Sequence, residues 1–321
     1  MTNKENAIRT MKYDHPEWVM SAPPCKGIQY AGCNHECPIT GKGHDEHAVS
    51  EQWHDIWGTG WVKEKAGVMA FPRLHPLAEP SALHAYTWPD ANDERLYASI
   101  YQMAERIEPG DYFICGQNRD TLWERAYMLI GMEDLMVYFY EEPAFVKEVL
   151  GRIMDFQLGM AKHYVKAGIE MVALSDDLGT QNSLLLHPNI MRAFLLPEYK
   201  RLCGFYKEHG VYINFHSCGH IEPALEMFMD LGIDILNPVQ ATANNLANVK
   251  RIVHGKMAVQ GGISSGLVES GPIERIEQDV REKLALFGRE GGYFCCIDQH
   301  VPTPEAHREA ITRTLAAYGA C

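Results

Sequence analysis

Residues 211–239 read VYINFHSCGHIEPALEMFMDLGIDILNPV and contain the repeat unit that decides the fold. VYINFHS (211–217) is a short apolar run with the composition of a strand, and IEPALEMFMDLG (221–232) has apolar residues at helical spacing. IDILNPV (233–239) is a second strand-like run. A strand, a helix and a strand in this order predict two parallel strands joined by a right-handed crossover.

The same alternation continues on both sides of this stretch. Further strands are predicted at 111–116, 170–176, 257–263 and 292–297, with helices at 187–210, 244–255, 272–291 and 304–319. PEWVMSAPP (16–24) is a candidate first strand. Seven or eight strand–helix units predict an α/β fold, namely a single (β/α)8 TIM-type barrel domain over residues 1–321.

Two features qualify this interpretation. Residues 25–90 are irregular and rich in Gly, His, Pro and Trp, so they predict long loops or a lid over the mouth of the barrel. An open, doubly wound sheet is the alternative architecture. It would be favoured by a glycine-rich dinucleotide loop, but the chain contains neither G-x-G-x-x-G nor a Walker motif.

Composition excludes several classes of protein. A formal charge of −13 over 321 residues argues against nucleic-acid binding, which needs clustered Lys and Arg, and against an anionic membrane surface. The first twenty residues lack the apolar core of a signal peptide, and no apolar run is long enough to span a membrane. We therefore expect a cytoplasmic protein whose nine cysteines are free thiols or metal ligands.

Metal-binding residue types follow two of the predicted strands. His216 and Cys218 are two residues apart, so their side chains leave the same face of a strand. A thiolate and an imidazole nitrogen are usual zinc ligands, and Cys295 or Cys296 ends a later strand of the same barrel. Three protein ligands and one open position would make a catalytic zinc site. Equally, these cysteines could be small core residues, with His216 a hydrogen-bonded core histidine.

Carboxylates and amides occupy other predicted strand ends. Asp176 and Asp177 are adjacent, so at most one side chain is expected to enter the mouth, where it could bind metal or transfer a proton. Their alternative role is a helix cap or an Asx turn. Polar side chains expected to contact a substrate are Asn214, Gln240, Gln260, Gln181 and His300.

A second group of soft ligands lies near the N-terminus. Residues 25–54 contain Cys25, Cys33, His35, Cys37, His44, His47 and His54. None of their spacings matches a zinc-binding motif. We favour a lid without metal, with a second metal site as the alternative.

Several motifs resemble one known superfamily. SDDLGTQNSLLLHP (175–188), NFHSCGHIEPALEMFMDLGIDILNPVQ (214–240), VQGGIS (259–264) and GGYFCCIDQHVPTPEA (291–306) are similar to motifs of the uroporphyrinogen decarboxylase superfamily. The likeness is to its branch of corrinoid-dependent methyltransferases, of the methylcobamide:coenzyme M type. It covers about residues 110–320 and implies a (β/α)8 barrel.

The resemblance also implies a ligand set. Methyltransferases of this branch bind zinc through H-x-C and a distant Cys, which His216, Cys218 and Cys296 match, with Cys295 as the alternative. The family usually follows that distant Cys with a short Pro-containing turn, whereas IDQH (297–300) intervenes here. The decarboxylases instead bind their polycarboxylate substrate through an arginine-rich N-terminal motif. The first 60 residues of this chain contain one arginine, Arg9.

Three functions follow as hypotheses. The first is zinc-dependent transfer of a methyl group between a corrinoid, supplied by a partner protein, and a small thiol or other heteroatom substrate. The second is metal-free decarboxylation by a lyase that uses Asp176 or Asp177. The third is a non-catalytic barrel that binds a corrinoid or tetrapyrrole.

Overall fold

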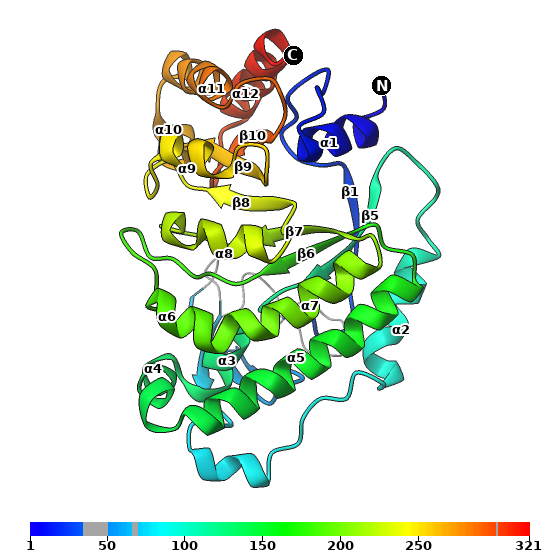
Figure 1. The fold of residues 1–321 in the computed structure, drawn as a ribbon, viewed down its shortest axis with the longest axis vertical. Helices are drawn as coiled ribbons and strands as arrows, with labels where there is room; N and C mark the ends of the chain where they lie inside the picture. Colours follow the sequence, from blue (N-terminus) through cyan, green and yellow to red (C-terminus); the bar gives the residue numbers. More distant parts are fainter. Residues whose placement is uncertain (35–50, 66–69, 300) are drawn as a thin grey trace.

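The structure, a computed structural model, describes residues 1–34, 51–65, 70–299 and 301–321. Its centre is a curled sheet of seven strands that are all parallel and follow one another around the sheet in chain order (Figure 1). The strands are β1 (Cys25–Ile28), β5 (Phe113–Asn118), β6 (Met171–Ser175), β7 (Tyr212–His216), β8 (Ile235–Val239), β9 (Ala258–Ile263) and β10 (Tyr293–Ile297). The predicted α/β class and parallel sheet are confirmed.

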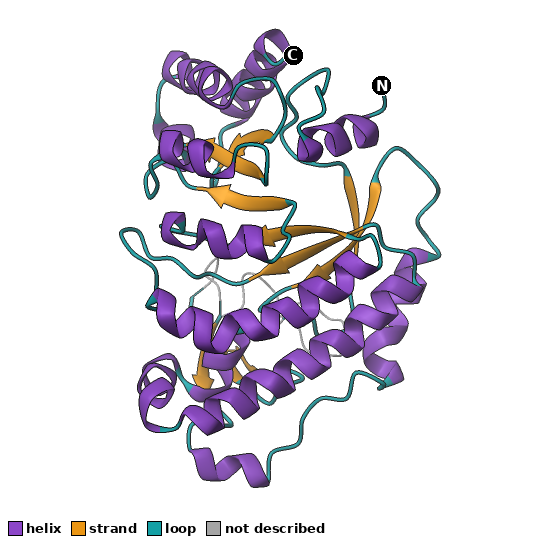
Figure 2. Cartoon of the chain, viewed as in Figure 1, coloured by secondary structure: helices purple, strands orange, loops and turns teal. Residues whose placement is uncertain are grey.

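Helices cover the outside of this sheet (Figure 2). They are α2 (Glu94–Ala104), α3 (Trp123–Ile130), α4 (Met132–Glu141), α5 (Pro143–Lys166), α7 (Leu196–Glu208), α8 (Leu225–Asp230), α9 (Leu246–Val253), α10 (Ser265–Ser270), α11 (Ile273–Phe287) and α12 (Glu305–Tyr318). The predicted helix 187–210 is divided into α6 (Pro188–Ile190), a π-helical turn (Met191–Leu195) and α7. None of the described helices has the length and apolar character needed to cross a membrane.

An eighth strand is not seen among the described residues, so the predicted eight-stranded closure is not confirmed. The predicted strand at 16–24 instead forms an isolated bridge between Trp18 and Ala320. Beside it, the Cys295 N–H donates to the Met20 carbonyl at 2.8 Å, so this extended segment lies against the free edge of β10. The segment follows α1 (Asn3–Lys12), which also packs against β9 and β10.

The inside of the sheet is apolar at one end and polar at the other. Residues that share one apolar cluster close the end where the strands begin: Ala7, Met11, Phe113, Cys115, Met171, Ile235, Ala258 and Phe294. Side chains alternate along a strand, so residues two and four positions further on face the same interior. In β7 and β8 these positions carry Asn214, His216 and Asn237, and the polar end therefore coincides with the carboxyl ends of the strands.

A small antiparallel sheet lies within the region that was predicted to be irregular. Its strands are β2 (Glu51–His54), β3 (Gly60–Lys63) and β4 (Phe71–Leu74), and Trp61 packs against Met128 of α3. A 3-10 helix (Pro80–His84) follows. The expectation of loops throughout 25–90 is therefore wrong in part, because β1 belongs to the main sheet and β2–β4 form a sheet of their own. Residues 35–50 and 66–69 lie outside the described residues.

A buried carboxylate joins the small sheet to α3. Asp55 accepts hydrogen bonds from the backbone N–H groups of Trp57 at 2.9 Å and Thr59 at 3.0 Å, which fixes the β2–β3 turn. It also accepts from Trp61 Nε1 at 3.1 Å and from Arg125 Nη1 at 2.6 Å. Asp55 and Arg125 are both almost fully buried, so neither charge is hydrated. Arg125 also pairs with the buried Asp120 at 3.1 Å, so removing Asp55 would leave the guanidinium with one of its two carboxylate partners.

We expect Asp55→Ala to lower the free energy of unfolding by about 3–5 kcal/mol, because it removes one of the two carboxylates paired with the buried Arg125 and leaves the buried N–H groups of Trp57, Thr59 and Trp61 without their acceptor. The measurement is urea unfolding followed by circular dichroism. Glu64→Ala is the control, because Glu64 pairs with Arg73 on the exposed surface of the same small sheet, and such pairs contribute about 0–1 kcal/mol. Equal losses in the two variants would contradict the proposed importance of the buried pair.

Candidate metal centre

Three side chains with metal-binding atoms meet at the carboxyl end of the sheet. One ligand atom from each of Asp177, His216 and Cys218 lies within 4.8 Å of the other two. His216 Nε2 is 3.2 Å from Cys218 Sγ and 3.5 Å from Asp177 Oδ1. This is the one such group among the described residues, and neither Cys295 nor Cys296 belongs to it. Nitrogen, sulfur and oxygen donors at these separations are a set that zinc accepts.

A chain of two amides fixes the orientation of the His216 ring. His216 Nδ1 is 3.0 Å from Asn237 Oδ1. The Asn237 amide nitrogen donates to Asn214 Oδ1 and, at 3.4 Å, to the Phe215 carbonyl. Asn237 therefore presents its oxygen to the ring, and Nδ1 must carry the proton. The lone pair is left on Nε2, which faces Cys218 and Asp177.

The Cys218 thiol is held in place by its surroundings but is not ionised by them. Its backbone N–H donates to Asp177 Oδ1 at 2.9 Å, and Gln299 Nε2 donates to its sulfur at 3.0 Å. Burial, followed by the negative charge of Asp177, raises the pKa of the Cys218 thiol to about 12. A cation bound between the two groups would remove this repulsion and stabilise the thiolate.

Cys296 and Cys295 lie elsewhere on β10. The Cys296 thiol accepts a hydrogen bond from Gln260 Nε2 at 3.6 Å and donates to the Ile297 carbonyl at 3.4 Å. Cys295 is fully buried. In the sheet, β8 and β9 separate β10 from β7, and each strand spacing is about 4.8 Å. The structure thus does not bring the expected distant cysteine to His216 and Cys218.

The two adjacent aspartates have different surroundings. Asp177 lies at the mouth, and its side chain is 44% exposed. Asp176 is fully buried, and its carboxylate accepts from the backbone N–H groups of Leu122 and Glu124, both at 2.8 Å, and from the Tyr199 hydroxyl at 2.5 Å. Asp176 therefore caps the start of α3 and does not reach the mouth. Asp177 is the carboxylate that could contact a ligand.

A cavity of about 370 Å³ opens beside His216. It is lined by Gln117, Asn118, Arg119, Ala173, Leu174, Ser175, Asn214, His216, Asn237 and Gln260. Amides dominate this lining, and among the described residues Arg119 is its one permanent cation and no carboxylate takes part. Ligand pockets are often about 300–1,000 Å³, so the cavity fits a small polar molecule.

The remaining residues expected to bind substrate are dispersed. Asn214 and Gln260 line the cavity, but the Gln240 side chain accepts from the Gly219 N–H and so holds the turn after β7. Gln181 is exposed and donates to the Thr242 hydroxyl at 3.2 Å. His300 lies outside the described residues, as do His35, Cys37, His44 and His47.

Sequence reasoning missed two residues of this region. Gln299 contacts Cys218, and the charge of Glu124 raises the pKa of Cys218. Asn237, which orients His216, stands at a predicted strand end among polar residues, but the strand pattern assigned it no role. Glu124 lies inside a helix, and Gln299 follows a strand far from Cys218 in the chain. The sequence position of neither residue relates it to the H-x-C motif.

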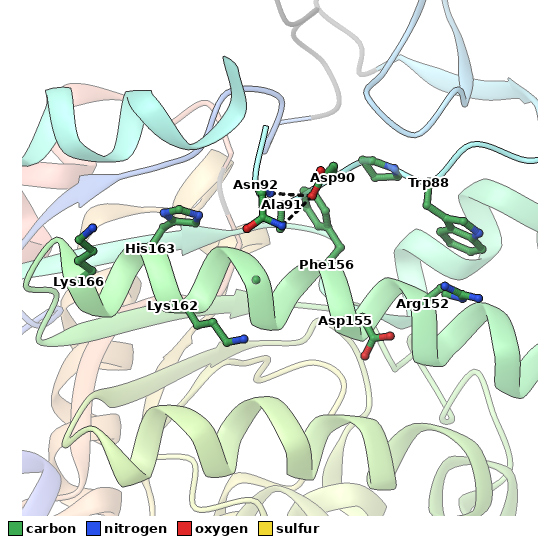
Figure 3. Close-up of a pocket in the computed structure, with 12 residues that line it drawn as sticks. Trp88, Asp90, Ala91, Asn92, Arg152, Asp155, Phe156, Lys162, His163 and Lys166 are labelled. Carbon is green, nitrogen blue, oxygen red and sulfur yellow. Dashed lines mark hydrogen bonds between the residues drawn. The ribbon is translucent and has the colours of Figure 1, made fainter. Parts of the chain in front are cut away.

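A larger cavity of about 480 Å³ lies away from this centre, between residues 88–92 and the outer face of α5 (Figure 3). Several of its charged side chains are already paired. Arg152 donates to Glu148 at 2.8 Å, and Asp155 accepts from Arg201 at 2.5 Å. The Asp90 carboxylate accepts from Asn92, as the dashed lines show. The cavity beside His216, which adjoins the metal-binding atoms, is therefore the better candidate for chemistry.

Comparisons with known proteins agree on one family. The model of the uroporphyrinogen decarboxylase (URO-D) family matches residues 72–314. The uroporphyrinogen decarboxylase of Mannheimia succiniciproducens is 26% identical over 258 residues, which cover 76% of this chain and 71% of that protein. That of Histophilus somni is 25% identical over 269 residues, covering 78% and 74%.

A solved structure shares the fold over the whole length. A methyltransferase from Methanosarcina mazei superposes with a TM-score of 0.71 at 18% identity, covering 99% of each chain. At this identity the likeness establishes the fold alone. It supports a TIM-type arrangement for the curled parallel sheet.

We expect Asn237→Ala to weaken zinc binding by about 10–100-fold, because the His216 ring would lose the acceptor that fixes its tautomer. Competition with a chromophoric chelator measures the affinity. Asn182→Ala, on the exposed loop after β6, is the matched control and should bind zinc as the wild type does. Unchanged affinity in Asn237→Ala would contradict the role of the amide chain.

Proposed function

The chain belongs to the uroporphyrinogen decarboxylase family, and from this membership we propose that it is a zinc-dependent methyltransferase. It would transfer a methyl group between a corrinoid, carried by a partner protein, and a small thiol or other heteroatom substrate. The observation that carries the proposal is the Asp177–His216–Cys218 group beside a polar cavity. The name of the Methanosarcina mazei relative agrees with this assignment.

Each side chain has a defined task in this proposal. His216 Nε2, the Cys218 sulfur and the Asp177 carboxylate would hold zinc and leave one position open, as catalytic zinc sites do. Zinc would supply Lewis-acid stabilisation of a substrate heteroatom. Asn237 would keep the His216 lone pair directed at the ion, and Gln299 would donate to the thiolate.

The cavity lining supports a small polar substrate. Amide side chains at 117, 118, 214, 237 and 260 offer donors and acceptors in fixed positions, which suits a compact polar molecule. Arg119 could neutralise one anionic group. A substrate that contacts both Arg119 and His216 would extend from the end of β5 to the end of β7. These strand ends are two strand spacings apart, which is about 10 Å.

Decarboxylation of a carboxylated substrate is the second candidate, because the relatives from Mannheimia and Histophilus are named uroporphyrinogen decarboxylases. Its substrate would need cationic partners for its carboxylates. In the part of the chain that the structure describes, the cavity beside His216 offers Arg119 alone as a permanent cation, so a substrate with many carboxylates would bury unpaired charge against these residues. The lining therefore favours the first candidate.

Metal analysis tests the proposed centre. Freshly prepared wild-type protein should contain about one zinc per chain by mass spectrometry. Cys218→Ser, His216→Ala and Asp177→Asn should each lower the zinc content because each removes one ligand atom. Cys296→Ser is the matched cysteine control and should retain zinc. Loss of zinc in Cys296→Ser with retention in Asp177→Asn would contradict Asp177 as the third ligand.

The activity has its own test. We expect the zinc-loaded protein to exchange a methyl group between free methylcobalamin and small thiols, followed by the change in the cobalamin absorption spectrum. Chelation of the zinc should abolish this exchange, and restoring zinc should recover it. Zinc-independent release of CO2 from a carboxylated substrate, without methyl exchange, would favour the lyase instead.

A further inference from the structure

Three sulfur-bearing side chains lie at the apolar end of the sheet, away from the candidate zinc centre. Cys25 is the first residue of β1, Met171 is the first residue of β6, and Cys115 lies near the start of β5. Cys115 and Met171 both belong to the apolar cluster that closes this end. By sequence, Cys25 belongs to the soft ligands of residues 25–54, whereas its sulfur neighbours in the structure come from β5 and β6.

Strand register places the three side chains on one face. β1, β5 and β6 are adjacent and parallel, and β1 and β5 lie side by side (Figure 1). Cys115 is the direct partner of Met171. Cys25 is the direct partner of Phe113, which stands two residues before Cys115. Direct partners on neighbouring strands, and residues two apart in one strand, point to the same side of a sheet, so all three sulfur atoms enter the interior.

The sulfur atoms also converge. The Cys25 thiol donates to Met171 Sδ at 3.6 Å, although β5 separates their two strands. These side chains can meet only over β5, where their partners are Phe113 and Cys115. The Cys115 side chain, which points to the same face, therefore lies beside the contact. A hydrogen bond with Cys115 lowers the pKa of the Cys25 thiol and raises the pKa of Cys115, so Cys25 is the first of the two to ionise.

This donor set favours a soft ion. A sulfur ligand lies about 2.3 Å from its metal in zinc sites, so two sulfurs that share an ion of similar size are at most about 4.6 Å apart. The 3.6 Å between Cys25 Sγ and Met171 Sδ is within that limit. Thiolates and thioethers together are ligands that Cu(I) prefers, whereas protein zinc sites use thiolates, imidazoles and carboxylates. The other members of the apolar cluster carry no oxygen or nitrogen in their side chains.

The position is shielded but has a route to solvent. Cys115 and Met171 are buried, whereas Cys25 is exposed. In the sheet that the structure describes, β1 is an edge strand, so an ion could enter beside Cys25. Once bound, it would connect this edge strand to β5 and β6.

We propose that Cys25, Cys115 and Met171 form a second metal site, which binds one Cu(I) ion and ties β1 to β5 and β6. The site is separate from the candidate zinc centre, because the two lie at opposite ends of the strands, and it does not rest on the proposed function. Binding replaces the two thiol protons, which pass to solvent, and leaves the oxidation state of the copper unchanged.

Titration of the zinc-loaded protein with Cu(I) in the absence of air, in competition with a chromophoric Cu(I) chelator, tests the site. The wild type should take one Cu(I) per chain from the chelator, and Cys25→Ser and Cys115→Ser should lose this equivalent because each removes a thiolate. The zinc content should stay the same in both variants. Cys321→Ser, which removes an exposed thiol elsewhere, is the matched control and should bind copper as the wild type does.

X-ray absorption at the copper edge identifies the ligands. The wild type should show three sulfur neighbours and Met171→Leu two, since this substitution removes the thioether and conserves the volume of the side chain. Bound Cu(I) should also raise the unfolding temperature of the wild type but not of Cys25→Ser, because the ion binds the folded state. Copper retained by Cys25→Ser, a wild type that leaves all copper with the chelator, or an unchanged sulfur number in Met171→Leu would overturn the proposal.

Discussion

The buried carboxylate of Asp176 joins the parts on which the candidate site depends. It accepts hydrogen bonds from the first turn of α3 and from Tyr199 of α7, and it stands directly after β6. Burial raises the pKa of Asp176 to about 7, although these three donors oppose the shift. The hydrogen bonds of Asp176 thereby hold β6, α3, α7 and the adjacent Asp177 in fixed positions relative to one another. This anchor helps to fix the position of Asp177 at the carboxyl end of the sheet.

Side chains alternate between the two faces of each strand, and this alternation decides which residues line the interior of the sheet, where chemistry can occur. The same interior face carries apolar residues such as Phe113 and Met171 where the strands begin, and amides and His216 where they end. Helix α1 contributes Ala7 and Met11 to the apolar end, which closes it. Among the described residues, the interior of the sheet therefore receives a polar ligand at its polar end, where the metal-binding atoms of the candidate zinc centre lie. Members of one family can share this TIM-type fold and differ in reaction, because the polar residues at the strand ends can change without disturbing the apolar end.

The sequence predicted the parts of this arrangement that depend on local periodicity. The strand–helix alternation from 111 to 319 gave the parallel sheet, and the two-residue spacing of His216 and Cys218 placed both at one strand end. Contacts between separate loops could not be predicted in this way. Asp177 approaches Cys218 because the turns after β6 and β7 are joined by the hydrogen bond from the Cys218 N–H. The distant cysteine, expected from resemblance, lies three strands away on β10.

The ligand set is the central claim, and X-ray absorption at the zinc edge of the metal-loaded protein tests it most directly. Coordination by Asp177, His216 and Cys218 predicts a single sulfur neighbour at about 2.3 Å, with nitrogen and oxygen neighbours at about 2.0–2.2 Å. The spectrum should not change in Cys296→Ser. Two sulfur neighbours in the wild type, reduced to one in Cys296→Ser, would contradict the account and restore the two-cysteine centre expected from the resemblance.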